Sequence, residues 1–390
     1  MRKTVITGVG MTPFGRFEDR SIKDLAAEAI SGAFQDADVT FDDVQAVFFA
    51  NATAGVTTGQ ECIRGETVTH HMGARALPVN NVENACASGG NALHLAWSAV
   101  AGGQYDCALA VGVEKLYFSD KQKSFSAFMG GMDVDFRDIG EGAGVTRSPF
   151  IDRYAKVADL LLSERDVTPE AFAAVASKAH GNGAMNPLAQ RRTPRSPEEV
   201  MASRSVLGPL TVLMCSPIGD GAAAAIVTRG DVAKDPRAVE ILASQLRSLP
   251  AEASGPADSH ELSAAAAFEQ AGLGPADMDF AEVHDATAPG EIVSWVESGL
   301  CPPGEEQKWA MTGHTTRDGG ALPVNPSGGL VARGHPLGAT GLAQVYEIVQ
   351  QLRGEAGDRQ LDRARTAFAQ CGGGLIKGST AVSCAHILSV

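Results

Sequence analysis

The chain has 390 residues, enough to bury a large core, and 44% of them are hydrophobic, as in an ordinary globular protein. The formal net charge of -14 argues against a general nucleic-acid binder, because such proteins carry an excess of basic residues. No apolar stretch is long enough to cross a membrane, so we expect no membrane span.

The cysteines are scattered along the chain, and none belongs to a C-x-x-C pair. The seven positions are Cys62, Cys86, Cys107, Cys215, Cys301, Cys371 and Cys384. An odd and unclustered set is typical of a reducing compartment, which we take as the cytoplasm. It also provides no zinc-binding pattern, so we expect no metal site.

Apolar runs alternate with amphipathic segments along the chain, which predicts an α/β fold. The predicted strands are residues 3–9, 46–50, 107–113, 222–228, 239–245, 280–284, 366–370 and 379–388. The predicted helices are residues 23–34, 88–101, 154–164, 259–271 and 342–352.

The first and second halves of the chain contain similar successions of turn, helix and strand. The turn that holds Cys86 leads into a helix and then the strand D-C-A-L-A-V-G, and G-H-P-L-G-A-T-G leads likewise into a helix and the strand R-T-A-F-A-Q. We therefore predict two similar βα halves joined near residue 235. The first comprises residues 1–114 and 211–235, and the second residues 236–390. Residues 115–210 are richer in Arg, Phe, Met and Pro and are interpreted as an inserted region that covers the substrate.

The stretch V-E-N-A-C-A-S-G-G places Cys86 directly before a predicted helix. A thiol at a helix N-terminus feels the positive end of the helix dipole, which favours the thiolate. Cys86 is therefore a candidate nucleophile, although a small buried thiol is the common alternative.

Three further motifs lie at turns or strand ends. His335 lies in the glycine-rich run G-G-L-V-A-R-G-H-P-L-G-A-T-G, His284 ends an apolar strand in E-V-H-D-A-T, and Cys371 begins C-G-G-G after another strand. Each residue also has a purely structural alternative: His335 could stabilise a turn, His284 could be a core histidine, and Cys371 could be a packing cysteine. For Asp285, we favour a structural role as a cap or in a turn. Two thiols and two imidazoles together are the set that acyl transfer through a thioester needs.

Together these motifs resemble those of the thiolase family, in particular its sterol-carrier-protein-type branch, over essentially the whole chain. Cys86-Ala87-Ser88 is similar to the nucleophile motif C-x-S, Gly334-His335-Pro336 to G-H-P, and Cys371-Gly372-Gly373 to C-x-G. His284-Asp285 stands where this branch carries His-Asp-Cys-Phe, and N-P-S-G-G and M-C-S-P-I-G-D-G-A-A also resemble this branch.

The resemblance implies a five-layered αβαβα thiolase fold and an enzyme that cleaves or forms a 3-oxoacyl-CoA. Cys86 would carry the acyl group, and His335 would take its proton. His284 would join His335 in one oxyanion hole, and the backbone N–H groups of Cys86 and Gly373 would form the second. Cys371 would act as acid and base toward the enolate. No tightly bound cofactor is implied, since coenzyme A is a substrate.

Two departures from the branch keep an alternative open. Ala286 and Thr287 replace its Cys and Phe, which leaves Cys371 as the acid/base candidate, and L-I-K-G after C-G-G-G is an unusual continuation. If Cys371 misses the site, the chain would be a retro-aldolase or C–C lyase on a CoA ester, working beside a partner with an OB-fold and a zinc ribbon. A non-catalytic acyl-CoA-binding subunit is a third hypothesis.

The phosphates of CoA need positive charge. Basic residues of the inserted region and the serine–glycine pair of N-P-S-G-G are the candidates: Lys178, Arg191, Arg192, Ser327 and Gly328. The resemblance further implies a homo-oligomer, either a dimer or a dimer of dimers.

Overall fold

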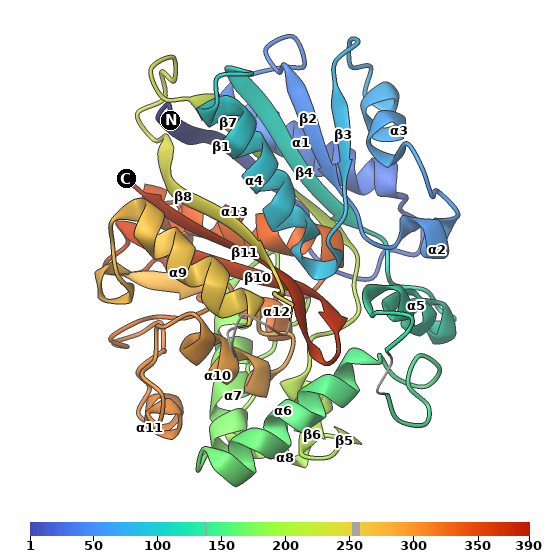
Figure 1. The fold of residues 1–390 in the computed structure, drawn as a ribbon, viewed down its shortest axis with the longest axis vertical. Coiled ribbons are helices and arrows are strands. Elements are labelled where there is room, and N and C mark those ends of the chain that lie inside the picture. Colours follow the sequence, from blue (N-terminus) through green and yellow to red (C-terminus); the bar gives the residue numbers. More distant parts are fainter. Residues whose placement is uncertain (137–138, 252–257) are drawn as a thin grey trace.

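The computed structural model describes residues 1–136, 139–251 and 258–390. Its main strands are β1 (Thr4–Met11), β2 (Ala46–Ala50), β3 (Val79–Val82), β4 (Cys107–Glu114), β7 (Gly221–Arg229), β8 (Val239–Ser248), β9 (Phe280–Glu282), β10 (Thr366–Ile376) and β11 (Ser379–Ser389). Within the described residues they form one sheet in the order β3-β2-β4-β7-β1-β8-β11-β10-β9 (Figure 1). A small separate hairpin pairs β5 (Ser205–Leu207) with β6 (Leu210–Thr211).

The helices pack on the faces of this sheet, and two of them lie between its two halves. They are α1 (Ile22–Ala37), α2 (Ala54–Thr58), α3 (Arg64–His71), α4 (Ser88–Ala101), α5 (Lys121–Phe128), α6 (Phe150–Glu164), α7 (Pro169–Met185), α8 (Pro197–Ala202), α9 (Ser259–Ala271), α10 (Ala288–Glu297), α11 (Glu306–Met311), α12 (Gly329–Ala332) and α13 (Thr340–Arg353). In the described part of the chain, no helix has the length and apolar character that crossing a bilayer requires.

The layers follow the order α-β-α-β-α. The first half of the sheet packs α1 on its outer face, and the second half packs α9 on its outer face. Helices α4 and α13 lie between the halves, since α4 contacts β4, β2 and β11 while α13 contacts β7 and β10. Among the described residues, the strands of the two halves are joined by a short antiparallel pairing of Val5 and Ile6 in β1 with Glu240 and Val239 in β8.

The duplication is visible in the strand pairing. β4 pairs antiparallel with β7 and parallel with β2, and β10 pairs antiparallel with β11 and parallel with β9. β2 pairs parallel with β3, and its counterpart β9 makes a parallel bridge from Ala281 to Val324. Each half then continues into a short 3-10 turn, η1 (Ala85–Ala87) or η6 (Leu337–Ala339), and a central helix.

Two expectations need correction. We predicted one helix in residues 115–210, but α5, α6, α7 and α8 lie there, because the alanine- and glycine-rich sequence of α7 hides its periodicity. We also placed Cys371 after a strand, whereas β10 runs on to Ile376 and pairs Cys371 with Cys384 of β11. Gly372 and Gly373 remain in the ladder, paired with Ser383 and Val382 of β11, whereas Gly374 has a φ of 65° and is skipped by the pairing.

Glycines bring the two central helices together at their N-termini. A Cβ on Gly89 would lie 2.7 Å from the carbonyl oxygen of Gly338, and one on Gly341 would overlap the backbone of Gly90. Only hydrogen fits in these places. The residues just before each helix, which include Cys86 and His335, are thereby brought close together.

Gly341→Ala is expected to lower the free energy of unfolding by about 1–3 kcal/mol, because the added methyl group meets backbone that cannot move cheaply. Gly181→Ala in α7 is the matched control, since its Cβ would have no neighbour within 4 Å. That control should raise stability by about 0.5–1 kcal/mol through helix propensity. Urea titrations of both variants measure the difference, and a Gly341→Ala protein as stable as the unmodified one would contradict this account of the helix contact.

Candidate active site

Cys86 lies in η1, at the turn between β3 and α4, and its side chain is 6% exposed. The preceding Ala85 has a φ of 48°, a left-handed conformation that is costly for a residue with a Cβ. Ser88 holds this turn, since its hydroxyl donates to the carbonyl of Ala85 at 2.6 Å and accepts from the N–H of Asn84 at 2.8 Å. The predicted turn before a helix is confirmed, and the serine of the C-A-S motif explains its shape.

His335 lies in the loop between α12 and η6, with 8% of its surface exposed. Its Nδ1 is 2.7 Å from the hydroxyl of Thr340, and that hydroxyl donates to the carbonyl of Pro336 at 2.9 Å. Because the only hydroxyl proton is used on Pro336, the Thr340 oxygen accepts from Nδ1–H. This assigns the tautomer of His335 and leaves its Nε2 as a proton acceptor.

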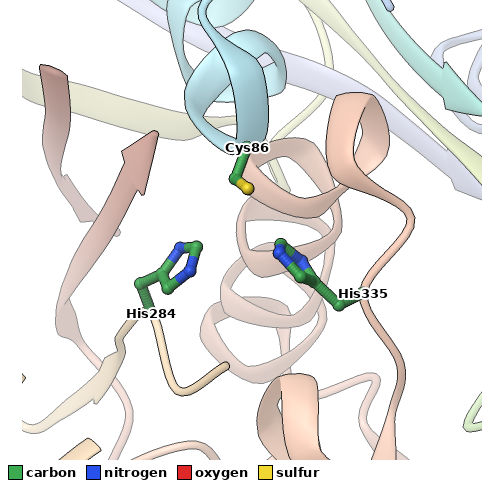
Figure 2. A group of neighbouring side chains, drawn as sticks. All are labelled: Cys86, His284 and His335. Carbon is green, nitrogen blue, oxygen red and sulfur yellow. The ribbon is translucent and has the colours of Figure 1, made fainter. Parts of the chain in front are cut away.

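His284 lies two residues after β9, which ends at Glu282 and not at the predicted residue 284. Its ring meets that of His335 edge-on, with 5.1 Å between ring centroids. Cys86, His284 and His335 point toward one another (Figure 2), and one donor atom from each lies within 4.8 Å of the other two. Two nitrogens and a sulfur at this spacing are also donors that a Zn²⁺ ion accepts.

Cys371 projects from β10 into the same cluster. Its Sγ is 3.5 Å from Nδ1 of His284 and 3.2 Å from the carbonyl oxygen of Cys86. The unusual L-I-K-G continuation therefore does not move the thiol away, because Leu375 and Ile376 continue the pairing of β10 with β11. The structure brings together all four side chains that the sequence analysis singled out.

The cluster is neutral. Burial, with the nearby charge of Glu114, raises the pKa of the Cys86 thiol to about 12. Burial also lowers the pKa of His335 to about 3 and that of His284 well below its usual value. Our expectation that the helix dipole would favour a Cys86 thiolate is therefore wrong for the resting site, because desolvation outweighs the dipole.

Glu114, at the end of β4, fastens the His335 loop to the first half of the molecule. Its carboxylate accepts from Asn51 Nδ2 at 2.9 Å, from the hydroxyl of Thr53 at 2.8 Å and from the N–H of Gly338 at 3.0 Å. Gly338 lies three residues after His335. The sequence analysis missed Glu114. The feature that could have identified it is a single carboxylate at the end of an otherwise apolar strand.

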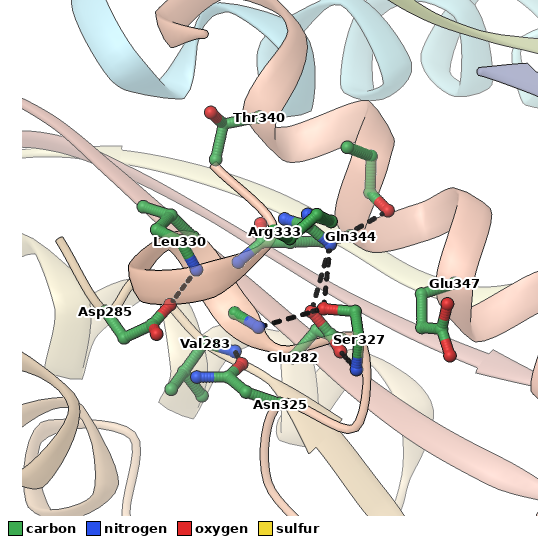
Figure 3. Close-up of polar contacts among 12 residues, drawn as sticks. Glu282, Val283, Asp285, Asn325, Ser327, Leu330, Arg333, Thr340, Gln344 and Glu347 are labelled. Atoms are coloured by element: carbon green, nitrogen blue, oxygen red, sulfur yellow. Dashed lines mark hydrogen bonds and ion pairs between the residues drawn. The ribbon is translucent and has the colours of Figure 1, made fainter. Parts of the chain in front are cut away.

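A second buried network includes Val283 and Asp285, the neighbours of His284 in sequence (Figure 3). Asp285 accepts from the N–H of Leu330 at 2.6 Å, so it caps α12, which confirms the structural role that we favoured for it. Arg333, with 1% of its surface exposed, pairs with Glu282 at 3.2 Å. Burial raises the pKa of Glu282 to about 7, although the charge of Arg333 opposes the shift.

Ser327 and Gly328, expected near CoA, belong to this network instead. Ser327 is fully buried and donates to Glu282 from its N–H at 3.0 Å and its hydroxyl at 2.8 Å. A Cβ on Gly328 would lie 2.8 Å from the backbone of Gly183 in α7. Both residues pack the loop before α12, so they serve the position of His335.

Two of the three expected basic residues are also engaged inside the protein. Lys178 contacts Glu291, the Thr315 hydroxyl and the carbonyl of Val324, which accounts for its three N–H donors. The guanidinium of Arg191 donates to three backbone carbonyls, those of Cys215, Val331 and Val212. Arg192 is exposed.

A cavity opens from the cluster and continues between α6 and α10. Phe128, Phe150 and Leu337 give it apolar walls, and the strand residues Gly372 and Gly373 form another side. Ala286, which stands where the resembled branch has a cysteine, also lines it. The polar residues Arg153, His260 and Glu297 lie along the same cavity, and the sequence analysis missed them because the partners are far apart in the chain.

Comparison with known proteins agrees with this geometry. Residues 4–194 match the family described as "Thiolase, N-terminal domain", and residues 247–388 match "Thiolase C-terminal domain-like". The acetyl-CoA acetyltransferase of Methanothermobacter thermautotrophicus is 39% identical, with the whole of both chains covered. The benzoylsuccinyl-CoA thiolase subunit BbsB of Thauera aromatica is 34% identical over 96% of this chain and 95% of its own.

Solved structures share the fold. The structure titled "Ltp2-ChsH2(DUF35) aldolase" superposes with a TM-score of 0.80 at 23% identity, covering 100% of this chain and 98% of that one. Human mitochondrial 3-ketoacyl-CoA thiolase gives a TM-score of 0.73 at 17% identity, with 100% and 98% covered. The resemblance inferred from the sequence motifs is confirmed: the chain belongs to the thiolase family and is, as such, a CoA-dependent acyltransferase.

Proposed function

We propose that the enzyme cleaves or forms 3-oxoacyl-CoA through an acyl group carried on Cys86. The observation that carries this proposal is the proximity of the Cys86 thiol to His335, with one donor atom of each within 4.8 Å of the other, where Thr340 leaves Nε2 of His335 as the proton acceptor. Thr340 supports the role of His335 because it occupies Nδ1 and so fixes which nitrogen faces the thiol.

In the cleavage direction, proton transfer from Cys86 to Nε2 of His335 accompanies attack of Sγ on the keto carbon. The bond between that carbon and the α-carbon then breaks, and its electron pair leaves with the CoA-linked enolate. The thiolate of a second CoA molecule finally takes the acyl group from Cys86. Since both partners start neutral, charge appears only during the reaction, inside a dry site where oriented donors stabilise it strongly.

Two sets of donors suit the two oxygens on which charge develops. His284 and the protonated His335 would bind the thioester oxygen of the CoA-linked unit. The N–H groups of Cys86 and Gly373 would bind the oxygen of the acyl group. A Cβ on Gly373 would lie 2.7 Å from the N–H nitrogen of Ala87, and this tight packing of β10 on η1 supports the second hole.

Cys371 is the proposed acid and base for the enolate. Its proton can go to the Cys86 carbonyl or to Nδ1 of His284, and the second arrangement leaves Nε2–H of His284 as the oxyanion donor. Ala286 supports this assignment, because it places a methyl group where the branch would carry a competing thiol.

Among the five candidates for CoA binding, we propose only Arg192. The N–H groups of its neighbours Gln190 and Arg191 donate to the carbonyls of Arg333 and Ala332. That contact keeps the exposed guanidinium of Arg192 close to the His335 loop, a suitable place for a phosphate group of CoA.

The assembly, the location and the division of the chain also remain proposals. We propose a homo-oligomer in the cytoplasm, which the seven free thiols support. The pairing of β7 with β1 and β4 supports a first half made of residues 1–114 and 211–235. A partner with an OB-fold and zinc ribbon belongs to the lyase alternative, which the acyltransferase relatives do not favour.

Cys86→Ser is expected to lower turnover by several orders of magnitude while the fold persists, because an unactivated hydroxyl is a far weaker nucleophile. Intact-protein mass spectrometry after mixing with acetyl-CoA should show an acetyl adduct on Cys86 of the unmodified enzyme and none on the variant. Full activity of Cys86→Ser would refute the assignment.

Cys371→Ala is expected to separate the two half-reactions. Acetylation of Cys86 from acetyl-CoA should continue, because it needs no enolate, whereas condensation of two acetyl-CoA molecules should stop. The comparison of adduct formation with acetoacetyl-CoA production checks this. Normal condensation by the variant would move the acid/base role to another residue.

Alkylation of Cys86 by iodoacetamide should be slow at neutral pH and accelerate about tenfold per pH unit upward, because the thiol with its raised pKa of about 12 loses its proton only in alkali. Peptide mapping separates Cys86 from the other thiols. A preformed thiolate–imidazolium pair would instead give a fast and pH-independent rate near neutrality, and that result would overturn the neutral resting state.

A further inference from the structure

The cavity beside Cys86 contains polar groups that the proposed catalytic steps do not use. Its walls are largely apolar, yet Arg153 of α6, His260 of α9 and Glu297 of α10 also line it. Three separate helices therefore each bring a charged or titratable side chain to one apolar cavity. Such placement is typical of a site that fixes one polar group of a ligand.

His260 is 7% exposed, and its Nδ1 lies 2.7 Å from the carboxylate of Glu297. Its other nitrogen, Nε2, is buried and has no hydrogen-bond partner among the described residues. Nε2 lies against β10 at Gly372, where an added Cβ would overlap it. The free nitrogen therefore lies beside the strand residue that follows Cys371.

Arg153 presents a second unused donor. Its Nε is buried and, within the described residues, has no hydrogen-bond partner. Two unpartnered nitrogens on one cavity are unusual, because buried polar groups in proteins are nearly always hydrogen-bonded. A ligand that supplies an acceptor to each would complete them.

Two of the three helix residues Arg153, His260 and Glu297 are basic. Burial by itself lowers the pKa of His260, but the hydrogen bond and charge of Glu297 outweigh it and raise that pKa above the ordinary value. Glu297 is the carboxylate among these three cavity residues, and Asp258 at the N-cap of α9 adds negative charge beside His260. An apolar acyl chain would leave Nε of Arg153 and Nε2 of His260 buried without hydrogen-bond acceptors, which is costly.

We propose that the cavity selects a short acyl group that ends in a carboxylate, which Arg153 and His260 bind. This proposal rests on the proposed acyl-enzyme at Cys86. In the transfer step, the bond from acyl carbon to CoA sulfur breaks, the bond to Cys86 Sγ forms, and the Cys86 proton leaves through His335 to the CoA thiolate. Arg153 and His260 touch the distal carboxylate only, so they determine specificity.

Succinyl-CoA and butyryl-CoA test this proposal, because their acyl groups have the same number of carbons and differ in the terminal carboxylate. Rapid-quench mass spectrometry follows acylation of Cys86 by each ester. Succinylation should be at least about tenfold more efficient than butyrylation in the unmodified enzyme. In Arg153→Met, succinylation should fall by about tenfold or more while butyrylation is unchanged or faster.

Two further variants sharpen the result. His260→Gln removes the cation but keeps a side-chain donor, and it should lower the preference for succinyl-CoA in the same direction. Arg165→Met removes a positive charge just after α6, where Arg165 is half-exposed beside Glu306 at 3.7 Å, and should leave the preference unchanged. Circular dichroism confirms that each variant is folded.

Acetyl-CoA separates this proposal from the proposed function, because its acyl group has no terminal carboxylate for Arg153 or His260 to bind. Acetylation of Cys86 without any preference for succinyl-CoA would overturn the carboxylate site alone. Equal losses with both longer esters in Arg153→Met would also overturn it, since they would show a general effect on packing. Absence of an adduct with all three esters would overturn the acyl-enzyme and the carboxylate site together.

Discussion

The close contact between the N-termini of α4 and α13 is the constraint on which the site depends. Gly89 and Gly90 of α4 meet Gly338 and Gly341 of the other half with room for hydrogen only. Since the nucleophile and its base lie just before these two helices, the distance between them is determined by how closely the helices approach. Any side chain at this contact would push the two halves apart.

The duplicated fold explains why the two reactive groups can be brought together so simply. Cys86 lies within η1 before α4, and His335 lies two residues before η6, which leads into α13. One half supplies the thiol and the other supplies the imidazole. Glu114 then links the halves, because a carboxylate at the end of β4 accepts the N–H of Gly338 in the His335 loop.

Burial governs the chemistry that the site can perform. It holds Cys86 as a thiol and His335 as a neutral imidazole, so the reaction has to create its own charges. Because the site is buried, the hydrogen-bond donors around the cavity stabilise the developing charges far more strongly than they would in water. The same reasoning applies to Arg153 and His260, since a buried nitrogen without a hydrogen-bond partner is costly unless a ligand supplies an acceptor.

The sequence by itself determined the family, the α/β class, the duplication and the four residues of the cluster, because motifs such as C-A-S, G-H-P and C-G-G are local and their spacing survives in one dimension. Only the tertiary structure decided what those residues experience. The expected Cys86 thiolate was wrong because desolvation depends on neighbours from every part of the chain, and the internal contacts of Lys178 and Arg191 are equally invisible in a linear pattern. Glu114 and the pair of His260 with Glu297 were missed for the same reason: their partners lie far away in sequence, and packing alone brings them together.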